Sequence, residues 1–432
     1  MKITRTPTAI ISSKKGDTVI AQGWVHAIRS QKDICFIILR DITGKVQVVT
    51  TPSLAKDITL ESVIEVFGQV IAEPQSPGGF EVHAKKITVL SLADPTLPIP
   101  VVEKSGQTDQ QIRLDWRWID LRKPKNLLIF QIWTRMEHSF RQWWIDNGFI
   151  EIHSPKLMNT PSEGASELFK VPYFTKTAYL AQSPQFYKQM AMASGFERVF
   201  EIGPVFRANP SFTSRHDTEF TSYDMEVSFI HSHQDIVHME SELLVFVLRD
   251  IKASFGDQIK SLFKAEIIIP KIPFPQIPMA QVKKLLKKRG VPSEKEGDLS
   301  PEEERQLAEY IYEDTGHEFV FVTEYPTEVR PFYHMRVDSD TQLTKSFDLV
   351  WKGLEITTGA QREHRYDPLV HQATEKGLNL SQLAHYFDFF KYGCPPHGGL
   401  GFGPSRFIMK MLNLPNVREV TYLYRGINRL TP

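Results

Sequence analysis

The chain has 432 residues with 41% hydrophobic and 24% charged side chains, and its 51 Lys and Arg balance 51 Asp and Glu. These values are ordinary for a globular protein of two or three domains, and they exclude a peptide hormone, a disordered chain and a histone-like polycation. Two cysteines are too few for a disulfide framework or a thiolate zinc cluster, and no apolar run reaches the ~18–20 residues of a membrane helix. We therefore expect a soluble, cytoplasmic protein with no membrane partner.

The first part of the chain contains five short β-rich runs separated by polar or Gly/Pro turns. They cover residues 19–25, 35–39, 46–50, 63–71 and 80–90. Strands spaced so closely predict a small barrel of the oligonucleotide-binding type, which presents one strand face to single-stranded nucleic acid. A small β-domain without RNA contacts is the alternative.

A proline-rich stretch, residues 94–100, indicates a stiff linker after these strands. We place the first domain at residues 1–103, a hinge at 104–130 and the second domain at 131–432, with a small helical insertion around 275–318. Beyond the linker, apolar spacing over 126–147 predicts a helix whose aromatic stripe serves either the core or a subunit interface. The rest alternates strand-like and helical segments without a βαβ rhythm, which favours an α+β fold with an antiparallel sheet flanked by helices.

Two polar segments of the body have simple structural interpretations. His231, His233 and His238 are spaced like metal ligands, but Ser232 and Asp235 resemble a capping box that opens a helix, which we prefer to a zinc site. The acidic stretch 298–314 has a helical pattern, and we interpret it as a solvated helix in the insertion.

Three segments carry residues suited to phosphate chemistry. Glycines in 398–406 let the backbone approach a phosphate, and Arg406 lies one turn into a helix opened by Pro404. Arg207 ends a strand-like run at 198–206, and a polar loop with Arg215 and His216 leads to another strand at 219–230. Guanidinium groups can clamp phosphate oxygens bidentately, although solvated loop arginines are the alternative.

The segment 346–362 supplies two acids that could hold magnesium, the ion that accompanies ATP. Asp348 and Glu355 are seven residues apart, so simple alternation places them on opposite strand faces. A bulge, or Gly353, must therefore change the register if both acids act together. Structural salt bridges are the competing explanation.

Together these residues resemble class II aminoacyl-tRNA synthetases, specifically aspartyl-tRNA synthetases of the archaeal type. Segment 149–155 is similar to the family's first motif, which implies a homodimer, and segments 206–224 and 399–406 are similar to the second and third motifs. The second and third motifs usually contain a glutamate where this chain has Asn209 and Ser405. Segments 162–165 and 182–189 resemble aspartyl enzymes more closely than asparaginyl ones.

The resemblance implies an N-terminal five-stranded OB-fold barrel and a class II catalytic domain that uses ATP and Mg²⁺ to attach L-aspartate to tRNA(Asp) through an aspartyl-adenylate. The implied aspartate-binding residues are Glu163, Gln185, Lys188, Arg207, Asp224, Thr358 and Arg362. The implied ATP-binding residues are Arg207, Arg215, His216, Asp217, Phe220, Glu355, Gly403 and Arg406, of which Arg207 and Arg406 are the catalytic pair. The implied magnesium ligands are Asp348, Glu355 and Thr358.

In the barrel, the resemblance assigns anticodon contacts to Arg29, Phe36, Gln47 and Glu81. His26 and Pro77 are similar to the residues of family members that charge both tRNA(Asp) and tRNA(Asn), which implies tRNA(Asn) as a second partner and a downstream Asp-tRNA(Asn) amidotransferase. Two other functions stay open: a synthetase-like paralogue that activates aspartate for a non-tRNA acceptor, and a catalytically silent tRNA-binding protein.

Overall fold

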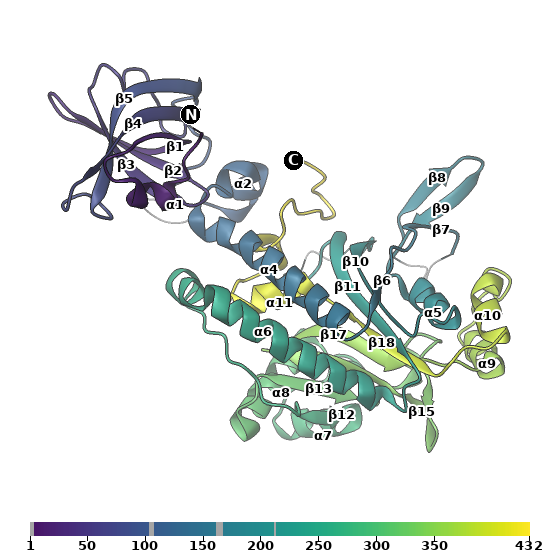
Figure 1. Cartoon of the computed structure of the whole chain (residues 1–432). Helices are drawn as coiled ribbons and strands as arrows, with labels where there is room; N and C mark the ends of the chain where they lie inside the picture. The colour runs from purple at the N-terminus through teal and green to yellow at the C-terminus, as the bar shows by residue number, and fades with distance from the viewer. Residues whose placement is uncertain (1–3, 103–107, 161–166, 211–212) are drawn as a thin grey trace. The chain divides into compact units, whose positions relative to one another are not determined.

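The computed structural model describes residues 4–102, 108–160, 167–210 and 213–432, which form two compact units, Met1–Asp120 and Leu121–Pro432 (Figure 1). The division falls within the segment 104–130 that we predict as a hinge. The residues on both sides of the limit predicted at 103/104 lie outside the described part, and residues 124–130 form the start of a long helix. No helix of the described ranges is both long and apolar enough to cross a membrane.

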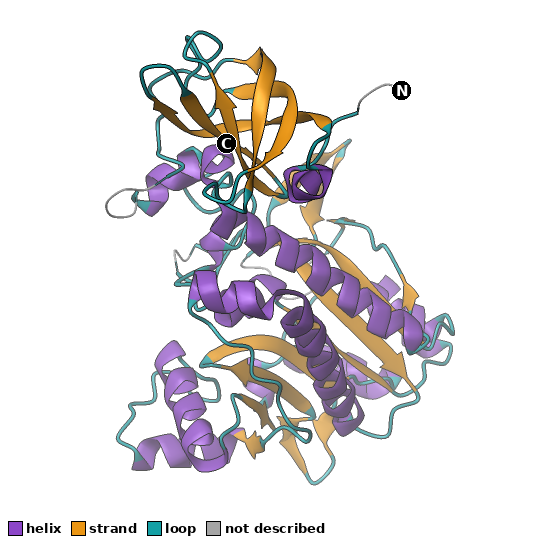
Figure 2. Cartoon of the chain, turned by 60° about the vertical axis from the view of Figure 1, so that its left-hand side comes forward, coloured by secondary structure: helices purple, strands orange, loops and turns teal. Residues whose placement is uncertain are grey.

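The first unit is a closed five-stranded barrel with the strand order β1-β2-β3-β5-β4 (Figures 1 and 2), which confirms the predicted OB-type barrel. The unit comprises α1 (Thr8–Ile11), η1 (Ser12–Lys14), β1 (Thr18–Ser30), β2 (Cys35–Asp41), β3 (Gly44–Thr50), β4 (Val63–Ala72), β5 (Phe80–Ser91), α2 (Gln110–Asp115) and α3 (Arg117–Asp120).

Apolar side chains at every second position of the strands fill the barrel interior. In β4 the buried residues Ile64, Val66 and Val70 alternate with partly exposed ones, as expected for a strand with one face toward the core. Gly23 is required where β1 pairs with β2, since a Cβ there would lie 2.3 Å from the carbonyl oxygen of Arg40. The core of this unit is therefore the inside of the barrel.

The second unit is built on an eight-stranded sheet with the order β12-β13-β16-β17-β18-β11-β10-β6. Its six central strands are antiparallel, as predicted, whereas the edge pairs β12/β13 and β6/β10 are parallel, so the sheet is mixed. The strands are β6 (Ile150–Glu151), β10 (Arg198–Phe206), β11 (Glu219–Ser228), β12 (Gln276–Pro278), β13 (Phe319–Thr323), β16 (Ser346–Trp351), β17 (Leu354–Gln361) and β18 (His397–Phe402).

Two small sheets and several helices surround the large sheet. The small sheets pair β7 (Leu157–Met158), β9 (Lys176–Leu180) and β8 (Lys170–Tyr173), and β14 (Arg336–Val337) with β15 (Asp340–Thr344). The helices are α4 (Pro124–Asp146), α5 (Gln185–Ala193), α6 (His233–Phe263), α7 (Met279–Lys288), α8 (Pro301–Thr315), α9 (Tyr366–Glu375), α10 (Ala384–Lys391) and α11 (Pro404–Met411), with the short turns η2 (Thr327–Val329) and η3 (Val417–Glu419).

Helices α4 and α6 lie side by side against the large sheet (Figure 1). The aromatic stripe predicted for α4 is buried there: Phe140 and Trp144 pack against Tyr223 of β11. Helix α6 begins with the predicted capping box, in which Ser232 and Asp235 bind each other's backbone N–H groups. The main core therefore forms between these two helices and the sheet.

Candidate active site

The second unit contains a cavity of about 300 Å³ whose wall comes from the β10–β11 hairpin, β17, β18, the start of α11 and the segment 330–334. The predicted site residues that line it are Gln185, Arg207, Arg215, His216, Asp217, Phe220, Asp224, Glu355, Thr358, Arg362, Gly403 and Arg406. Lys188 and Asp348 are buried and do not line this cavity. Glu163 lies outside the described residues.

Strand β11 places Ser222 and Asp224 in the wall of the cavity. Alternation along the strand puts Ser222, Asp224 and Glu226 on one side, and the Ser222 hydroxyl donates to Asp224 Oδ2 at 2.5 Å. Ser222 and Glu226 were not predicted as site residues, although the period of two from Asp224 is the signal that could have found them.

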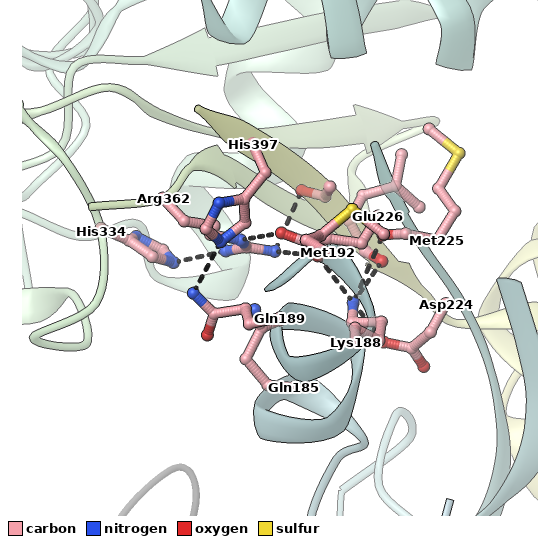
Figure 3. A network of polar contacts seen from close by, with 12 residues as sticks. Gln185, Lys188, Gln189, Met192, Asp224, Met225, Glu226, His334, Arg362 and His397 are labelled. Carbon is pink, nitrogen blue, oxygen red and sulfur yellow. Dashed lines mark hydrogen bonds and ion pairs between the residues drawn. The ribbon is translucent and has the colours of Figure 1, made fainter. Parts of the chain in front are cut away.

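A buried network of charges connects this strand to α5 and to Arg362, which follows β17 (Figure 3). Lys188, with a side chain 1% exposed, donates to Asp224 Oδ1 at 2.9 Å and lies 3.5 Å from Glu226 Oε2. Arg362 donates from Nε to Glu226 Oε1 at 2.9 Å. Burial favours the neutral form of Glu226, but the charges of Arg362 and Lys188 outweigh it and lower the pKa of this carboxyl.

The cavity wall also contains the arginines Arg207, Arg215 and Arg406. Arg207 lies over the ring of Phe220, with 5.7 Å from the guanidinium carbon to the ring centroid. Arg215 Nη1 donates to Glu304 Oε1 at 2.7 Å, and Arg406 Nη1 donates to the carbonyl oxygen of residue 355 at 3.0 Å. These guanidinium groups can bind the phosphates of a nucleotide.

Among the polar atoms of the cavity wall, Gln185 Nε2 and Asp217 Oδ1 are buried and have no hydrogen-bond partner within the described residues. Burial raises the pKa of Asp217 to about 7. Burial, followed by the charges of Arg406 and Arg215, lowers the pKa of His216 to about 4, so its imidazole is neutral near pH 7. Such groups are suited to partners supplied by a ligand.

The predicted magnesium ligands lie on β16 and β17, where Asp348 pairs directly with Thr358. A bulge between Leu349 and Val350 changes the register, as the spacing of the two acids required, and Thr358 Oγ1 donates to Glu355 Oε1 at 3.3 Å. Asp348 instead accepts from Arg330 Nη2 at 2.6 Å, and its Oδ1 is a buried oxygen without a partner in the described chain.

This donor set fits a hard cation that also binds phosphate. The described ranges contain no group of three His, Cys, Asp or Glu that could hold a metal ion by itself. Mg²⁺ in nucleotide sites is commonly held by one or two carboxylates together with the phosphates. Glu355 and Thr358 offer oxygens at the cavity wall, and the unpartnered Asp348 oxygen lies on the neighbouring strand.

The acidic helix α8 is solvated on one face only, where Glu309 and Glu313 are exposed, and not throughout as we expected. Its Glu303 and Glu304 are buried. Glu304 accepts from Arg215 and, at 3.0 Å, from the backbone N–H of Glu355. Helix α8 therefore supports residues of the cavity wall, and the charge pattern alone could not show which face of the helix is covered.

In the barrel, the predicted anticodon residue Gln47 is fixed by its neighbours. Its Nε2 donates to Glu81 Oε2 and to Ser76 Oγ, both at 3.0 Å. Glu81 also accepts from Ser76 at 2.5 Å. Because its amide nitrogen is engaged in this way, Gln47 can offer its carbonyl oxygen to a donor on a base edge.

The other barrel residues predicted from the sequence lie on β1 and β2 and in the turn between β4 and β5. Arg29 of β1 pairs with Phe36 of β2, and Phe36 is partly exposed, as a stacking platform requires. His26 Nδ1 lies 2.8 Å from Arg40 Nη1. Burial, then the charges of Lys45 and Arg40, lower the pKa of His26. Pro77 is exposed in the turn between β4 and β5.

Comparison with known proteins gives two profile matches. Residues 109–425 match a family described as class II tRNA synthetases (D, K and N), and residues 19–90 match an OB-fold nucleic acid binding domain. The first range contains the residues of the cavity, and the second covers the five barrel strands except for Thr18 and Ser91 at their ends.

Relatives match the chain over nearly its full length. The chain is 42% identical to an aspartate--tRNA(Asp/Asn) ligase of Methanopyrus kandleri, with 98% of each chain covered, and 39% identical to an aspartate--tRNA(Asp) ligase of Pyrococcus abyssi, with 99% of each covered. Among solved structures it is similar to asparaginyl-tRNA synthetase from Pyrococcus horikoshii complexed with asparaginyl-adenylate, with a TM-score of 0.91, 30% identity and 100% of each chain covered.

Proposed function

Because this chain belongs to the class II aminoacyl-tRNA synthetases of the D, K and N group, we propose that it attaches L-aspartate to tRNA(Asp) and tRNA(Asn) through an aspartyl-adenylate. The observation that carries this proposal is the cavity that gathers Asp224 and Arg362 together with Arg207, Arg215 and Arg406. An acid and a cation suit the ammonium group and side-chain carboxylate of aspartate, and the arginines suit the phosphates of ATP.

In the first step, an oxygen of the aspartate α-carboxylate attacks the α-phosphorus of ATP and pyrophosphate leaves. Arg207 contacts the α-phosphate, Arg215, His216 and Arg406 contact the terminal phosphates, and Phe220 stacks on adenine. The positive charges meet the negative charge that develops on the phosphate oxygens, so alignment and electrostatics supply catalysis without a protein nucleophile.

In the second step, a terminal ribose hydroxyl of tRNA attacks the carbonyl carbon of the adenylate and AMP leaves. Asp224, together with Glu163 from the sequence, holds the ammonium group of the amino acid, and Gln185 contributes a polar group beside them. Glu355 and Thr358, with Asp348 on the adjacent strand, would hold Mg²⁺, which would supply positive charge to the phosphates.

The direct test is aspartate-dependent ATP–pyrophosphate exchange together with charging of purified tRNA. We expect both reactions for the native protein and loss of both for Arg207→Ala. Exchange without charging of any tRNA would favour a paralogue with another acceptor, and tRNA binding without exchange would favour a silent binding protein.

The proposal that the protein also charges tRNA(Asn) rests on His26 and Pro77. We expect the native protein to aspartylate both tRNAs, and His26→Trp with Pro77→Lys to reduce charging of tRNA(Asn) more than that of tRNA(Asp). Charging of tRNA(Asp) alone by the native protein would remove the dual role. Dual charging would require an amidotransferase to convert Asp-tRNA(Asn).

We further propose a cytoplasmic homodimer. Ile145, Ile150 and Leu157, which flank or belong to the predicted dimer motif, are exposed by 60%, 49% and 46% in the single chain. Exposed apolar side chains that come from one short stretch of the chain suit an interface between two copies. Analytical ultracentrifugation should give the mass of two chains, and a mass of one chain would contradict this proposal.

A further inference from the structure

The segment 330–334 forms part of the cavity wall, and one of its side chains contacts the guanidinium of Arg362 directly (Figure 3). His334 is only 3% exposed, and its Nε2 lies 3.0 Å from Arg362 Nη1. The backbones of His334 and Arg362 also form an isolated antiparallel β-bridge. This bridge holds the segment 330–334 beside the end of β17.

The direction of this hydrogen bond follows from chemistry. Guanidinium groups only donate, so His334 Nε2 accepts and the ring proton is on Nδ1. Burial, then the charges of Arg362 and Arg330, lower the pKa of His334 well below its usual value, so the ring is neutral. A neutral acceptor orients Arg362 without cancelling its charge.

Other contacts of Arg362 come from different elements. Glu226 of β11 accepts from Nε, and the carbonyl oxygen of Gly399 in β18 accepts from Nη2 at 3.1 Å. Tyr333 presents its ring 5.7 Å from the guanidinium carbon. His334 adds an acceptor at Nη1, so its removal weakens the hold on that side of the guanidinium and allows the group to tilt.

We infer that His334 is a positioning residue for amino acid specificity: its acceptor fixes the guanidinium of Arg362 in the orientation that selects a carboxylate over a carboxamide. This inference rests on the proposed function, in which Arg362 binds the aspartate side chain. Glu226 and Gly399 engage Nε and Nη2, so the substrate carboxylate meets Arg362 at Nη1, the nitrogen that His334 orients. A carboxylate offers two acceptor oxygens there, whereas a carboxamide offers one oxygen and an NH₂ group that cannot accept.

The test measures ATP–pyrophosphate exchange with aspartate and with asparagine for His334→Leu and His334→Gln. For His334→Leu we expect KM for aspartate to rise about ten- to a hundredfold, as for loss of a hydrogen bond to a charged group, with KM for ATP unchanged. The preference for aspartate over asparagine should fall. Gln reaches the same position with an acceptor oxygen. For His334→Gln, KM for aspartate and the preference for aspartate over asparagine should therefore stay close to the native values.

Controls separate this role from a purely structural one. His371→Leu changes an exposed histidine of α9 and should leave all values unchanged. If His334→Leu does not fold, His334→Asn replaces it, because its acceptor falls one bond short of the Gln acceptor. Equal aspartate KM and specificity for variants with and without an acceptor would overturn the inference.

Arg362→Lys distinguishes failure of the inference from failure of the proposed function. If this variant keeps the native KM for aspartate, Arg362 does not bind the side chain and the proposed function loses that contact. If it raises KM while His334→Leu does not, Arg362 keeps its role and only the positioning by His334 is wrong.

Discussion

At the residue scale, Glu240 of α6 is a buried acid that the proposed chemistry does not use. Burial raises its pKa to about 8. The carboxyl is therefore neutral in the folded protein up to that pH, whereas in the unfolded chain it ionises above about 4.5. Since the unfolded state then binds fewer protons, the group destabilises the fold progressively as pH rises between these two values.

We predict that Glu240→Gln removes this pH-dependent loss of stability. The free energy of unfolding of the variant relative to the native protein should increase by roughly 3 kcal/mol between pH 5 and pH 8. Urea denaturation of both proteins at the two pH values, followed by tryptophan fluorescence, measures the change. The same difference at both pH values would show that Glu240 is ionised in the folded state.

His216 gives a second prediction at this scale. It is neutral near pH 7, because burial and two arginines lower its pKa to about 4, and the triphosphate of ATP should reverse the local charge and raise that pKa. ATP binding at pH 6 should therefore take up protons and strengthen as pH falls. Calorimetry in two buffers of different ionisation enthalpy measures the uptake, which should vanish in His216→Gln; unchanged uptake in that variant would assign the proton to another group.

At the element scale, helix α8 supports the phosphate side of the cavity through one acid. Glu304→Gln weakens the contact with Arg215 and with the backbone N–H of Glu355. We expect a rise of about tenfold in KM for ATP, with KM for aspartate unchanged, as for loss of one charge-assisted hydrogen bond. Glu309→Gln, at an exposed position of the same helix, is the control. Equal effects of the two substitutions would exclude a specific role of α8.

The strands and helices were predictable because their signals are local. The five barrel strands, the α4 stripe and the α6 capping box depend on spacing within a few residues, and the structure confirms each. Contacts that join distant segments had no such signal: Arg215 and Glu304 are 89 residues apart, and Arg362 and Glu226 are 136 apart. The site residues taken from the family resemblance remain predictions of role, although the cavity brings most of them together.

At the scale of the whole molecule, the two units have separate cores, and the proposed chemistry assigns amino acid activation to one and anticodon contact to the other. A change in the barrel should therefore affect only the step that requires tRNA. We predict that Phe36→Ala raises KM for tRNA about ten- to a hundredfold, since stacking of one base on an aromatic ring contributes about 1–3 kcal/mol.

The same variant should keep the native rate of aspartate-dependent ATP–pyrophosphate exchange, because that reaction needs no tRNA. Val89→Ala, at an exposed position of β5, controls for general effects on the barrel and should leave both reactions unchanged. If Phe36→Ala slowed exchange as much as charging, the barrel would influence activation itself. The proposal that the two units have separate roles would then be wrong. Loss of charging alone would assign Phe36 to tRNA recognition.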